Sequence, residues 1–512
     1  MTRLSDTRAT PVECVRQVWA GLRVFGIGSQ PVALARIALG ALPRHGMTVA
    51  GAIAITARVW GDRVALLDDR GAVTYAELGR ATERLAAALD HHRLVRAGTR
   101  VAVLCHDDRD LFVAAAAAGL AGGRVSQLSP RMGRARFRAW LADSGAELIL
   151  HAPDAADLLR GHPGRALSTG EFAGLAAGTP PGWPVPDRAR QSRSVMVTSG
   201  TTGVPKGIAI GRRASQPLAA FALAGSTRIR PGAPTLVWPA LHHGYGLAVA
   251  VLCLVVGSPV VTASALPRLS LADGAGQAAL AAIHRYGVEV VCAVPAQLRA
   301  LADALESDRH PPRLRAVVSG SDLLDQATIA ALQRTVGPVV VNFYGSTEAG
   351  TFTMATGPAV TGPGCVGRPI AGARVQIVGE DGTPVPIGVP GRVRVRSLMA
   401  SVADRPGSRW LTMGDRGYLD EGGRLHLLGR VGPVARLGGE FVDPAAVEDV
   451  LAGLPGVLAA SVEVVADGTY GRRMAASVRL APGQQADPAG WRAAVRDALG
   501  PAAVPREIVL RD

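Results

Sequence analysis

Short runs of β-branched residues alternate with helix-forming segments along most of this 512-residue chain. Val64–Asp69 and Val101–Cys105 are two such runs, and the segments that follow them, Thr74–Asp90 and Leu111–Leu120, are amphipathic and Ala-rich respectively. Thr74 is of a type suited to capping the first of these helices. The alternation continues to about residue 345, and it predicts an α/β fold with mostly parallel sheets flanked by helices.

Three segments depart from this alternation. Apolar residues recur at helical spacing in Val12–Phe25 and Val49–Trp60, which predicts a helical lead-in. Gly170–Arg193 is rich in Gly, Pro and Arg, and we expect a loop there. Val375–Arg396 has the pattern strand, Asp-Gly turn, strand, which indicates an antiparallel, β-barrel-like section.

Gly and Pro lie between two better-patterned stretches at Gly429–Pro433 and mark a candidate hinge. We therefore predict a large N-terminal domain, residues 1–430, which includes the β-barrel-like section. Residues 431–512 are predicted to form a small, mobile α+β domain.

The composition is that of a globular protein, with 48% apolar and 19% charged residues. The net charge of +14 raises the question of nucleic-acid binding. The basic residues are scattered, however, and no stretch pairs a basic stripe with stacking aromatics. We interpret the densest patch, Arg131–Arg138, as a solvated helix face. A diffuse positive field would still attract anionic nucleotides and coenzymes.

The cysteines are odd in number and far apart, and they form no CxxC pair, which argues against a disulfide framework or a zinc site. No secretory signal is visible at the N-terminus. The longest apolar run, Leu247–Val261, is shorter than the roughly 20 residues of a membrane span and is better interpreted as a buried helix followed by a strand. These features predict a cytoplasmic protein.

Lys206 is the only lysine in a chain with 54 arginines. It lies in Val197–Gly207 (VTSGTTGVPKG), where a β-branched run leads into a Ser/Thr/Gly loop. Glycines let the backbone approach a phosphate, hydroxyls and N–H groups donate to its oxygens, and Lys206 supplies positive charge. The alternatives are a flexible polar linker and chance survival of one lysine, but a linker explains neither the preceding strand nor the lysine.

Four further motifs follow in order: Pro239–Leu247 (PALHHGYGL), Ser319–Leu323 (SGSDL), Asn342–Gly350 (NFYGSTEAG) and Met413–Asp420 (MGDRGYLD). Together with VTSGTTGVPKG, they resemble the adenylate-forming superfamily of acyl-CoA synthetases, nonribosomal peptide adenylation domains and luciferases. The resemblance covers nearly the whole chain and is closest to bacterial fatty-acyl-CoA synthetases. It implies ATP and Mg²⁺ as cofactors, with coenzyme A as one possible acceptor.

The resemblance also implies roles for individual residues. Tyr344 would pack on the adenine, Thr347 would contact a phosphate, and Glu348 would hold Mg²⁺, as a hard cation prefers. Asp415 would accept hydrogen bonds from the ribose hydroxyls, and Arg430 would contact ribose or phosphate. The full set implied to bind nucleotide is Thr198, Ser199, Gly200, Thr201, Thr202, Lys206, Ser321, Asn342, Phe343, Tyr344, Gly345, Thr347, Asp415 and Arg430.

The motif PALHHGYGL resembles the segment that lines the acid pocket. His243 occupies the position where family members commonly carry a His near the acid carboxylate, and with Lys206 and Glu348 it completes the implied catalytic set. A His that is simply satisfied by partners within the fold is an equally good interpretation. Tyr245, Val294 and Pro295 are candidate pocket walls.

Two features depart from the family pattern. The family has Gly-Arg-x-Asp-Asp at the hinge, whereas this chain has Val431, Gly432 and Pro433 after Gly429 and Arg430. Family members also continue into a loop whose lysine contacts the acid, but this sequence ends at Asp512. The small domain is therefore expected to be truncated, and losing one preorganised donor costs about 2.7–4 kcal/mol in the transition state.

Three hypotheses follow. The first is an ATP-dependent ligase that adenylates an acid, releases pyrophosphate and transfers the acid to a nucleophile, by default CoA. The second is a ligase of specialised metabolism with an amine acceptor, which forms an amide or activates nitrite for an aryl amine. The third is a non-catalytic nucleotide-binding homologue, against which the retained Lys206, Glu348 and Asp415 argue. All three imply small-molecule partners, no nucleic acid and no integral membrane segment.

Overall fold

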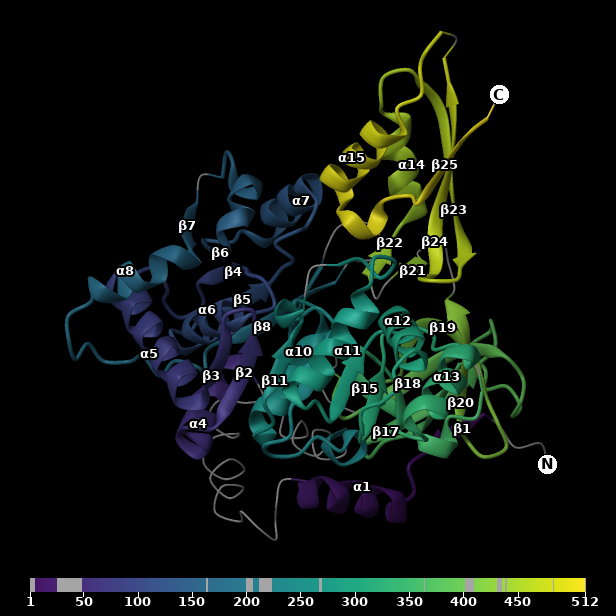
Figure 1. The fold of residues 1–512 in the computed structure, drawn as a ribbon, viewed down its shortest axis with the longest axis horizontal. Coiled ribbons are helices and arrows are strands. Elements are labelled where there is room, and N and C mark those ends of the chain that lie inside the picture. Colours follow the sequence, from purple (N-terminus) through teal and green to yellow (C-terminus); the bar gives the residue numbers. More distant parts are fainter. Residues whose placement is uncertain are drawn as a thin grey trace.

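The computed structural model describes residues 5–24, 48–162, 164–198, 206–210, 223–266, 269–362, 364–400, 409–430, 435–437, 440–481 and 483–511. Two large sheets flanked by helices form the body of the molecule, and a smaller sheet domain lies above it in Figure 1. The α/β class expected from the alternating pattern is therefore confirmed, as is the small C-terminal domain.

A 6-stranded sheet with the order β7-β6-β4-β5-β8-β9 forms one side of the body. Its strands are parallel except for the pair β8 and β9. The strands are β4 (Arg100–Leu104), β5 (Arg124–Gln127), β6 (Leu148–His151), β7 (Arg165–Ser168), β8 (Arg193–Thr198) and β9 (Lys206–Ile210). The associated helical segments are α5 (Tyr75–His91), α6 (Arg109–Leu120), α7 (Arg134–Ser144), η2 (Pro153–Leu159), η3 (Thr169–Glu171) and α8 (Phe172–Ala177).

A 14-stranded sheet runs across the other side, and its central strands β11, β10, β12, β13 and β14 are parallel. The strands of this half are β2 (Val64–Asp68), β3 (Gly71–Thr74), β10 (Thr235–Val237), β11 (Val260–Thr262), β12 (Val290–Ala293), β13 (Ala316–Ser319), β14 (Val340–Ser346) and β15 (Gly350–Thr356). The helical segments are α4 (Val49–Trp60), α10 (Gly244–Val256), η4 (Ala263–Ala265), α11 (Ala275–Tyr286), α12 (Pro295–Glu306), α13 (Gln326–Val336) and η5 (Gly357–Ala359).

The same sheet continues through β16 into an antiparallel section, as the pattern of Val375–Arg396 predicts. Its strands are β16 (Cys365–Pro369), β17 (Ala373–Val378), β18 (Gly391–Ser397), β19 (Leu411–Leu419) and β20 (Leu425–Arg430). The N-terminal segment adds β1 (Asp6–Arg8), which pairs with β17, and α1 (Pro11–Val24). Strand β1 is not expected from the sequence, because its three residues carry no apolar alternation.

The helices form where their ends are capped. The Thr74 side chain accepts a hydrogen bond from the Glu77 amide while Glu77 reaches back to Thr74, so α5 begins with a reciprocal capping box. A similar box at Ser168 and Glu171 starts the helical segments η3 and α8 inside a stretch expected to be a loop. That expectation is wrong for these residues, because a local cap outweighs a Gly-rich composition.

The apolar run Leu247–Val261 forms most of α10 and the strand β11, as predicted. Residues on every side of α10 are buried, because the helix lies within the main hydrophobic core. None of the helices in the described ranges combines the length and apolarity that crossing a bilayer requires.

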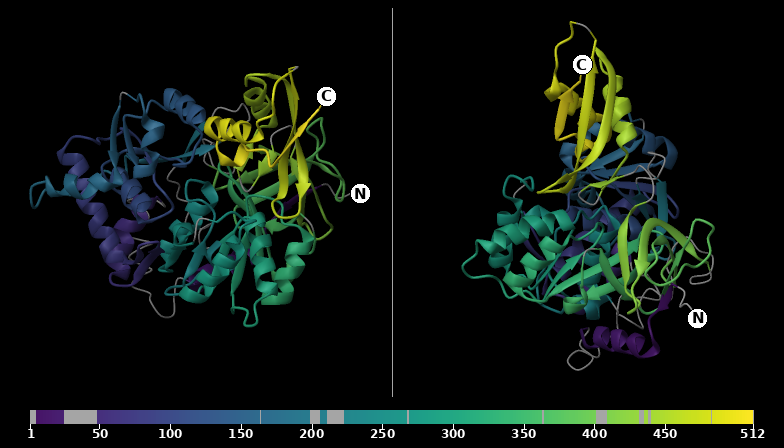
Figure 2. Two further views of the ribbon diagram at one scale, coloured as in Figure 1. Left: turned by 45° about the horizontal axis from the view of Figure 1, so that its top comes forward. Right: turned by 90° about the vertical axis from the view of Figure 1, so that its right-hand side faces the viewer.

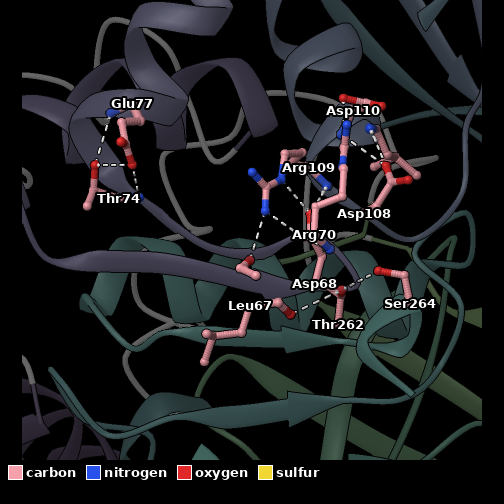
Figure 3. A network of polar contacts seen from close by, with 12 residues as sticks. Leu67, Asp68, Arg70, Thr74, Glu77, Asp108, Arg109, Asp110, Thr262 and Ser264 are labelled. Atoms are coloured by element: carbon pink, nitrogen blue, oxygen red, sulfur yellow. Dashed lines mark hydrogen bonds and ion pairs between the residues drawn. The ribbon is translucent and has the colours of Figure 1, made fainter. Parts of the chain in front are cut away.

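The two sheets are linked by a buried ion pair that Figure 3 shows from close by. The carboxylate of Asp68, at the end of β2, is fully buried and accepts hydrogen bonds from the Nε and the backbone N–H of Arg109, which begins α6. Burial disfavours the ionised form of Asp68, but the hydrogen bonds from Arg109 outweigh it and hold its pKa below the usual value. The second strand from the edge of one sheet is thus tied to the helix that covers the other.

The small domain has a hydrophobic core of its own, which includes Leu451, Val478 and Val495. Its elements are the hairpin β21 (Ala435–Leu437) and β22 (Glu440–Val442), α14 (Pro444–Ala452), β23 (Val457–Asp467), β24 (Gly471–Leu480), α15 (Pro488–Leu499), η6 (Pro501–Ala503) and β25 (Glu507–Leu510). Figures 1 and 2 show it seated on the body, with α15 next to α7. The boundary after residue 430 and the hinge at Gly432 and Pro433 stay predictions, since 431–434 lie outside the described residues.

Candidate active site

The strand β14 and its turn place much of the motif NFYGSTEAG at the carboxyl end of the parallel sheet, where ligands bind in open α/β folds. Thr347 and Glu348 lie in the tight turn between β14 and β15, and both are half-buried. The turn requires Gly345, because a Cβ atom there would stand 2.7 Å from the carbonyl oxygen of Gly350. The predicted phosphate and magnesium ligands are therefore held in a constrained loop.

A hydrogen bond joins two of the predicted nucleotide motifs. The hydroxyl of Tyr344 donates to the carboxylate of Asp415 on β19, and the Tyr344 ring packs edge-on against Phe352. Asp415 also pairs across the ladder with Arg430, the last residue of β20. The structure thus brings together the three residues predicted for adenine, ribose and phosphate.

The loop after β13 approaches the same place. Ser321 has a φ of 72°, an unusual value for a residue other than glycine and one found preferentially at functional sites. A Cβ atom on Gly320 would lie 2.4 Å from the ring of Phe343, so this loop packs directly on the adenine motif. The motif SGSDL is only a weak signal in the sequence, and the backbone geometry strengthens its assignment.

Asn342 is buried, and its Nδ2 donates to the carbonyl oxygen of Cys365 at 2.9 Å. This bond ties β14 to β16, so the amide nitrogen of Asn342 serves the fold. Its Oδ1 is buried and has no hydrogen-bond partner among the described residues.

The predicted phosphate loop connects the ends of two paired strands. Thr198 ends β8, Lys206 begins β9, and the two are partners in the antiparallel ladder. Of the predicted phosphate ligands, Ser199, Gly200, Thr201 and Thr202 lie outside the described residues, and so do the side chains of Thr198 and Lys206. Met196, two residues before Thr198, is buried and faces the site.

The acid-pocket motif meets the phosphate side of the site at the start of α10. His243 precedes the first helical residue, Gly244, and is half-buried. A Cβ atom built on Gly244 would lie 3.7 Å from Oγ1 of Thr347 and 3.9 Å from the methyl group of Met196. Two of the motifs and the strand that leads into the phosphate loop therefore come close together here.

The hydroxyl of Tyr245 is engaged within the fold, which agrees with its predicted place in a pocket wall. This hydroxyl donates to the carbonyl oxygen of Val318 at 2.8 Å, and the Tyr245 ring packs edge-on against Phe343. Burial raises the pKa of Tyr245 well above the usual value. Val294 and Pro295, at the start of α12, are likewise buried.

Asp107 is a polar residue next to the acid-pocket motif that no sequence motif identifies. Its Oδ1 accepts a hydrogen bond from the backbone N–H of Leu241 at 2.8 Å, which fixes the segment just before His242 and His243. Burial raises the pKa of Asp107 to about 6, against the opposing effects of that hydrogen bond and the charges of His106 and Arg131. A signal existed in the sequence, since an acidic cluster directly follows β4 at the carboxyl edge of a parallel sheet.

Among the described residues, one group of side chains has metal-ligand chemistry and suitable spacing: His242, His243 and Glu440 of the small domain, whose ligand atoms lie within 4.8 Å of one another. Burial and the charges of His243 and Arg136 lower the pKa of His242 well below its usual value. Because the Arg136 guanidinium opposes a cation there, this group is better understood as a contact between the domains. The half-buried carboxylate of Glu348, the predicted metal ligand, offers the hard oxygen donor that Mg²⁺ prefers.

Comparison with known proteins decides the family. Residues 53–402, more than half of the chain, match the family described as AMP-binding enzyme. The chain belongs to the AMP-binding enzyme family. The 2-succinylbenzoate–CoA ligase of Geobacillus kaustophilus is 30% identical over 473 residues, which cover 88% of this chain and 91% of that protein.

Two further AMP-binding relatives extend the comparison. The feruloyl-CoA synthase of an Amycolatopsis species is 29% identical and covers 96% of each chain. The solved amide bond synthetase McbA of Marinactinospora thermotolerans is 30% identical, with a TM-score of 0.78 over 91% of this chain and 95% of that chain. This AMP-binding enzyme is therefore an ATP-dependent, AMP-forming ligase, whose relatives include acid–CoA ligases and an amide bond synthetase.

Proposed function

We propose that this enzyme activates a carboxylic acid as its acyl-AMP and then passes the acyl group to a nucleophile, by default the thiol of CoA. The observation that carries the proposal is the bond between Tyr344 and Asp415, which joins the predicted adenine and ribose motifs. The approach of Gly244 to Thr347 supports it, because acid and phosphate would meet at that point.

The first half-reaction joins two anions, so the site must neutralise charge. An oxygen of the acid carboxylate attacks the α-phosphorus of ATP, the bond to the β-phosphate breaks, and pyrophosphate leaves. In our proposal Lys206 offsets the charge of the triphosphate, Thr347 contacts a phosphate, and Glu348 holds Mg²⁺. The metal supplies Lewis-acid stabilisation of the phosphate oxygens. Asp415 and Arg430 fix the ribose, while His243 and Tyr245 lie beside the acid.

An amine is the second candidate acceptor, and one comparison favours it. The amide bond synthetase McbA is as similar to this chain in sequence as the 2-succinylbenzoate–CoA ligase, at 30% identity. Attack of an amine on the acyl-AMP would give an amide instead of a thioester. The adenylation chemistry is the same in both cases, so the acceptor must be determined separately.

The test is a pyrophosphate-release screen that crosses acids with acceptors. The acids are 2-succinylbenzoate, ferulate, octanoate and malonate, and the acceptors are CoA, benzylamine, and aniline together with nitrite. We expect at least one acid to give pyrophosphate and AMP, with CoA raising the turnover. A higher rate with benzylamine identifies an amide synthetase, and AMP formation that needs aniline and nitrite but no organic acid identifies nitrite activation.

The same screen can overturn the proposal. If the enzyme binds ATP, as measured by calorimetry, but forms no AMP with any combination, it is a nucleotide-binding homologue without ligase activity. If ATP binding is absent as well, the assignment of the nucleotide site is wrong.

A further inference from the structure

A cleft of about 720 Å³ lies at the amino ends of the parallel strands β10, β12 and β13. Residues of the three segments that lead into these strands line it, within 228–230, 283–289 and 312–315. The candidate active site is built at the carboxyl ends of the same sheet. The cleft is therefore on the opposite edge of the sheet and is a separate feature of the fold.

Positive charge surrounds this cleft. One carboxylate, that of Glu289, is found among the lining residues. The lining residues thus carry an excess of three positive charges when the histidine among them is neutral. The charge comes from four arginines, all of them exposed: Arg228, Arg230, Arg313 and Arg315.

Glu289 cannot neutralise all four guanidinium groups. Arg230 donates to it through Nη2 at 2.7 Å and through Nε at 3.0 Å, and Nε of Arg315 lies 3.6 Å from the same carboxylate. Arg228 donates to a neutral group, the carbonyl oxygen of Arg315, at 3.4 Å. Arg313 has no hydrogen bond or ion pair with any residue that the structure describes. Donors therefore remain available for an anion.

The most basic stretch of the sequence, Arg131–Arg138, does not form a comparable site. The sequence suggests that it is a solvated helix face. The structure corrects that interpretation for the first turn of α7, because α15 packs against this helix and Gly133 is buried. The cleft differs from this stretch in that its arginines surround a space that a ligand can enter.

The cleft has an apolar floor beneath the arginines. Ile283, Val288 and Leu314 line it with buried aliphatic side chains, which belong to the hydrophobic core below. Small-molecule sites typically combine such an apolar surface with a few polar groups that fix the orientation of the ligand. The lining thus suits a molecule that has an anionic part and an organic part.

The backbone around the cleft is held by hydrogen bonds that continue the sheet. The N–H group of Arg315 donates to the carbonyl oxygen of Glu289 at 2.7 Å, and that of Glu289 donates to the carbonyl oxygen of Pro234 at 3.0 Å. The segments that carry the arginines are thus fixed relative to one another. A site organised in this way loses less free energy to ordering when a ligand binds.

Arg228 occupies a backbone position that favours glycine. Its φ is 57°, in the left-handed region, where a Cβ atom is unfavourable. Gly257 and Gly287, which end α10 and α11, have left-handed backbone without this disadvantage. Arginine at position 228 therefore stabilises the fold less than glycine would, and binding of an anion by its guanidinium group explains its presence.

We propose that this cleft binds the diphosphate or triphosphate group of a small molecule, at a site separate from the candidate active site. Guanidinium groups pair with phosphate oxygens in a bidentate geometry, and the three surplus charges suit an oligophosphate. A nucleic acid fits less well, because the lining residues include no Phe, Tyr or Trp on which bases could stack. The proposal goes beyond the ligase function and does not depend on it.

Calorimetric titration with inorganic tripolyphosphate tests the proposal in the Lys206→Ala background, which weakens the phosphate loop of the candidate active site. We expect saturable binding, and we expect Arg313→Ala, added to this background, to raise the Kd about tenfold. Arg309→Ala is the matched control, because Arg309 is an exposed arginine of the same loop that does not line the cleft. It should change the Kd less than about twofold.

Arg228→Gly adds a readout in which binding and stability change in opposite directions. It removes a guanidinium group but relieves the left-handed backbone, so we expect a higher Kd for tripolyphosphate together with a higher melting temperature. An unchanged Kd with a lower melting temperature would show that Arg228 serves the fold.

Titration with GTP in the same background distinguishes the two sources of the phosphate group. Tighter binding of GTP than of tripolyphosphate identifies a nucleotide that also uses the apolar floor, and equal affinities identify a free oligophosphate. Absence of saturable binding, or equal weakening by Arg309→Ala and Arg313→Ala, would overturn the proposal. In otherwise wild-type enzyme, Arg313→Ala should leave the KM for ATP in pyrophosphate exchange unchanged. A raised KM would contradict a separate site, whereas absence of exchange in the wild type would refute only the ligase function.

Discussion

The hydroxyl of Tyr344 donates a hydrogen bond to the carboxylate of Asp415, 71 residues further along the chain. This bond orients the carboxylate proposed to hold the ribose. A hydrogen bond to a charged group contributes about 1.5–3 kcal/mol. We therefore expect Tyr344→Phe to raise the KM for ATP about tenfold in the exchange assay and to change kcat less than threefold. Tyr418→Phe, on the same strand, is the control, since the Tyr418 ring stacks on His426 away from this bond.

Lys206→Ala is expected to lower kcat/KM for adenylation by roughly 10²–10³, the usual effect of removing a preorganised donor to transition-state charge. Lys206→Arg is the matched variant, because it keeps the positive charge but replaces a compact ammonium group with a larger, planar guanidinium group. We expect it to lose most of the activity as well. Wild-type turnover in Lys206→Ala, measured by pyrophosphate release, would show that the phosphate site lies elsewhere.

Arg109→Ala should destabilise the enzyme strongly, because it leaves the fully buried carboxylate of Asp68 without its ion-pair partner. Breaking a buried pair in this way costs about 3–5 kcal/mol. Urea denaturation at pH 7 measures the effect. Arg70→Ala provides the comparison, since Arg70 pairs with Asp110 at a more exposed position and should change the free energy of unfolding by less than about 1 kcal/mol. Equal effects of the two substitutions would contradict the proposed importance of the buried pair.

Asp107→Asn should change how stability depends on pH. Burial raises the pKa of Asp107 to about 6 in the folded protein, above its usual value of 3.8, so the folded state binds this proton more tightly. Stability is therefore lost as the pH rises from about 4 through 6. The asparagine cannot ionise, yet its Oδ1 can still accept the hydrogen bond from Leu241.

At about 1.4 kcal/mol per pH unit the effect would approach roughly 3 kcal/mol for a fully enclosed group. Water reaches the half-buried Asp107, so we expect about 1–2 kcal/mol. The variant should gain less stability relative to wild type at pH 4.5 than at pH 8, as thermal melts at both pH values would show. Asp143→Asn, at an exposed position, should show no such difference. A gain of the same size at both pH values would mean that ionisation of Asp107 is not the cause.

The sequence predicts well those secondary-structure elements that are determined by residues close together in the chain. The Thr74 cap, the helix at Val49–Trp60 and the antiparallel pair around Val375 each follow from a few neighbouring residues. The candidate nucleotide site stays a prediction, made motif by motif because each motif is a contiguous stretch of sequence. The place in the fold where these motifs meet could not be predicted, since no local pattern shows that Gly244 approaches Thr347.

Contacts that depend on packing between distant elements escape sequence reasoning altogether. In the sequence, Gly133 is an ordinary glycine in a basic stretch, and only the approach of Ala498 reveals why a side chain is excluded. The same holds for Glu440, which lies about 200 residues from His243 in sequence, and for Asp107, whose raised pKa comes from burial. The burial of a side chain and its distance from distant residues depend on how helices and sheets pack in the folded protein. A single sequence does not contain this information directly.

Helix α6 is an alanine-rich helix buried on all sides, and Ala114, Ala116, Ala117 and Ala118 have no exposed surface. Methyl groups thus set the spacing between this helix and its neighbours, and one added methylene typically costs about 1–3 kcal/mol in so dense a core. Evolution or engineering toward a bulkier acid therefore has little freedom in this layer. Such adaptation would have to come from the turns that face the substrate. Residues in a turn can change in size or conformation without changing the spacing between helix and sheet.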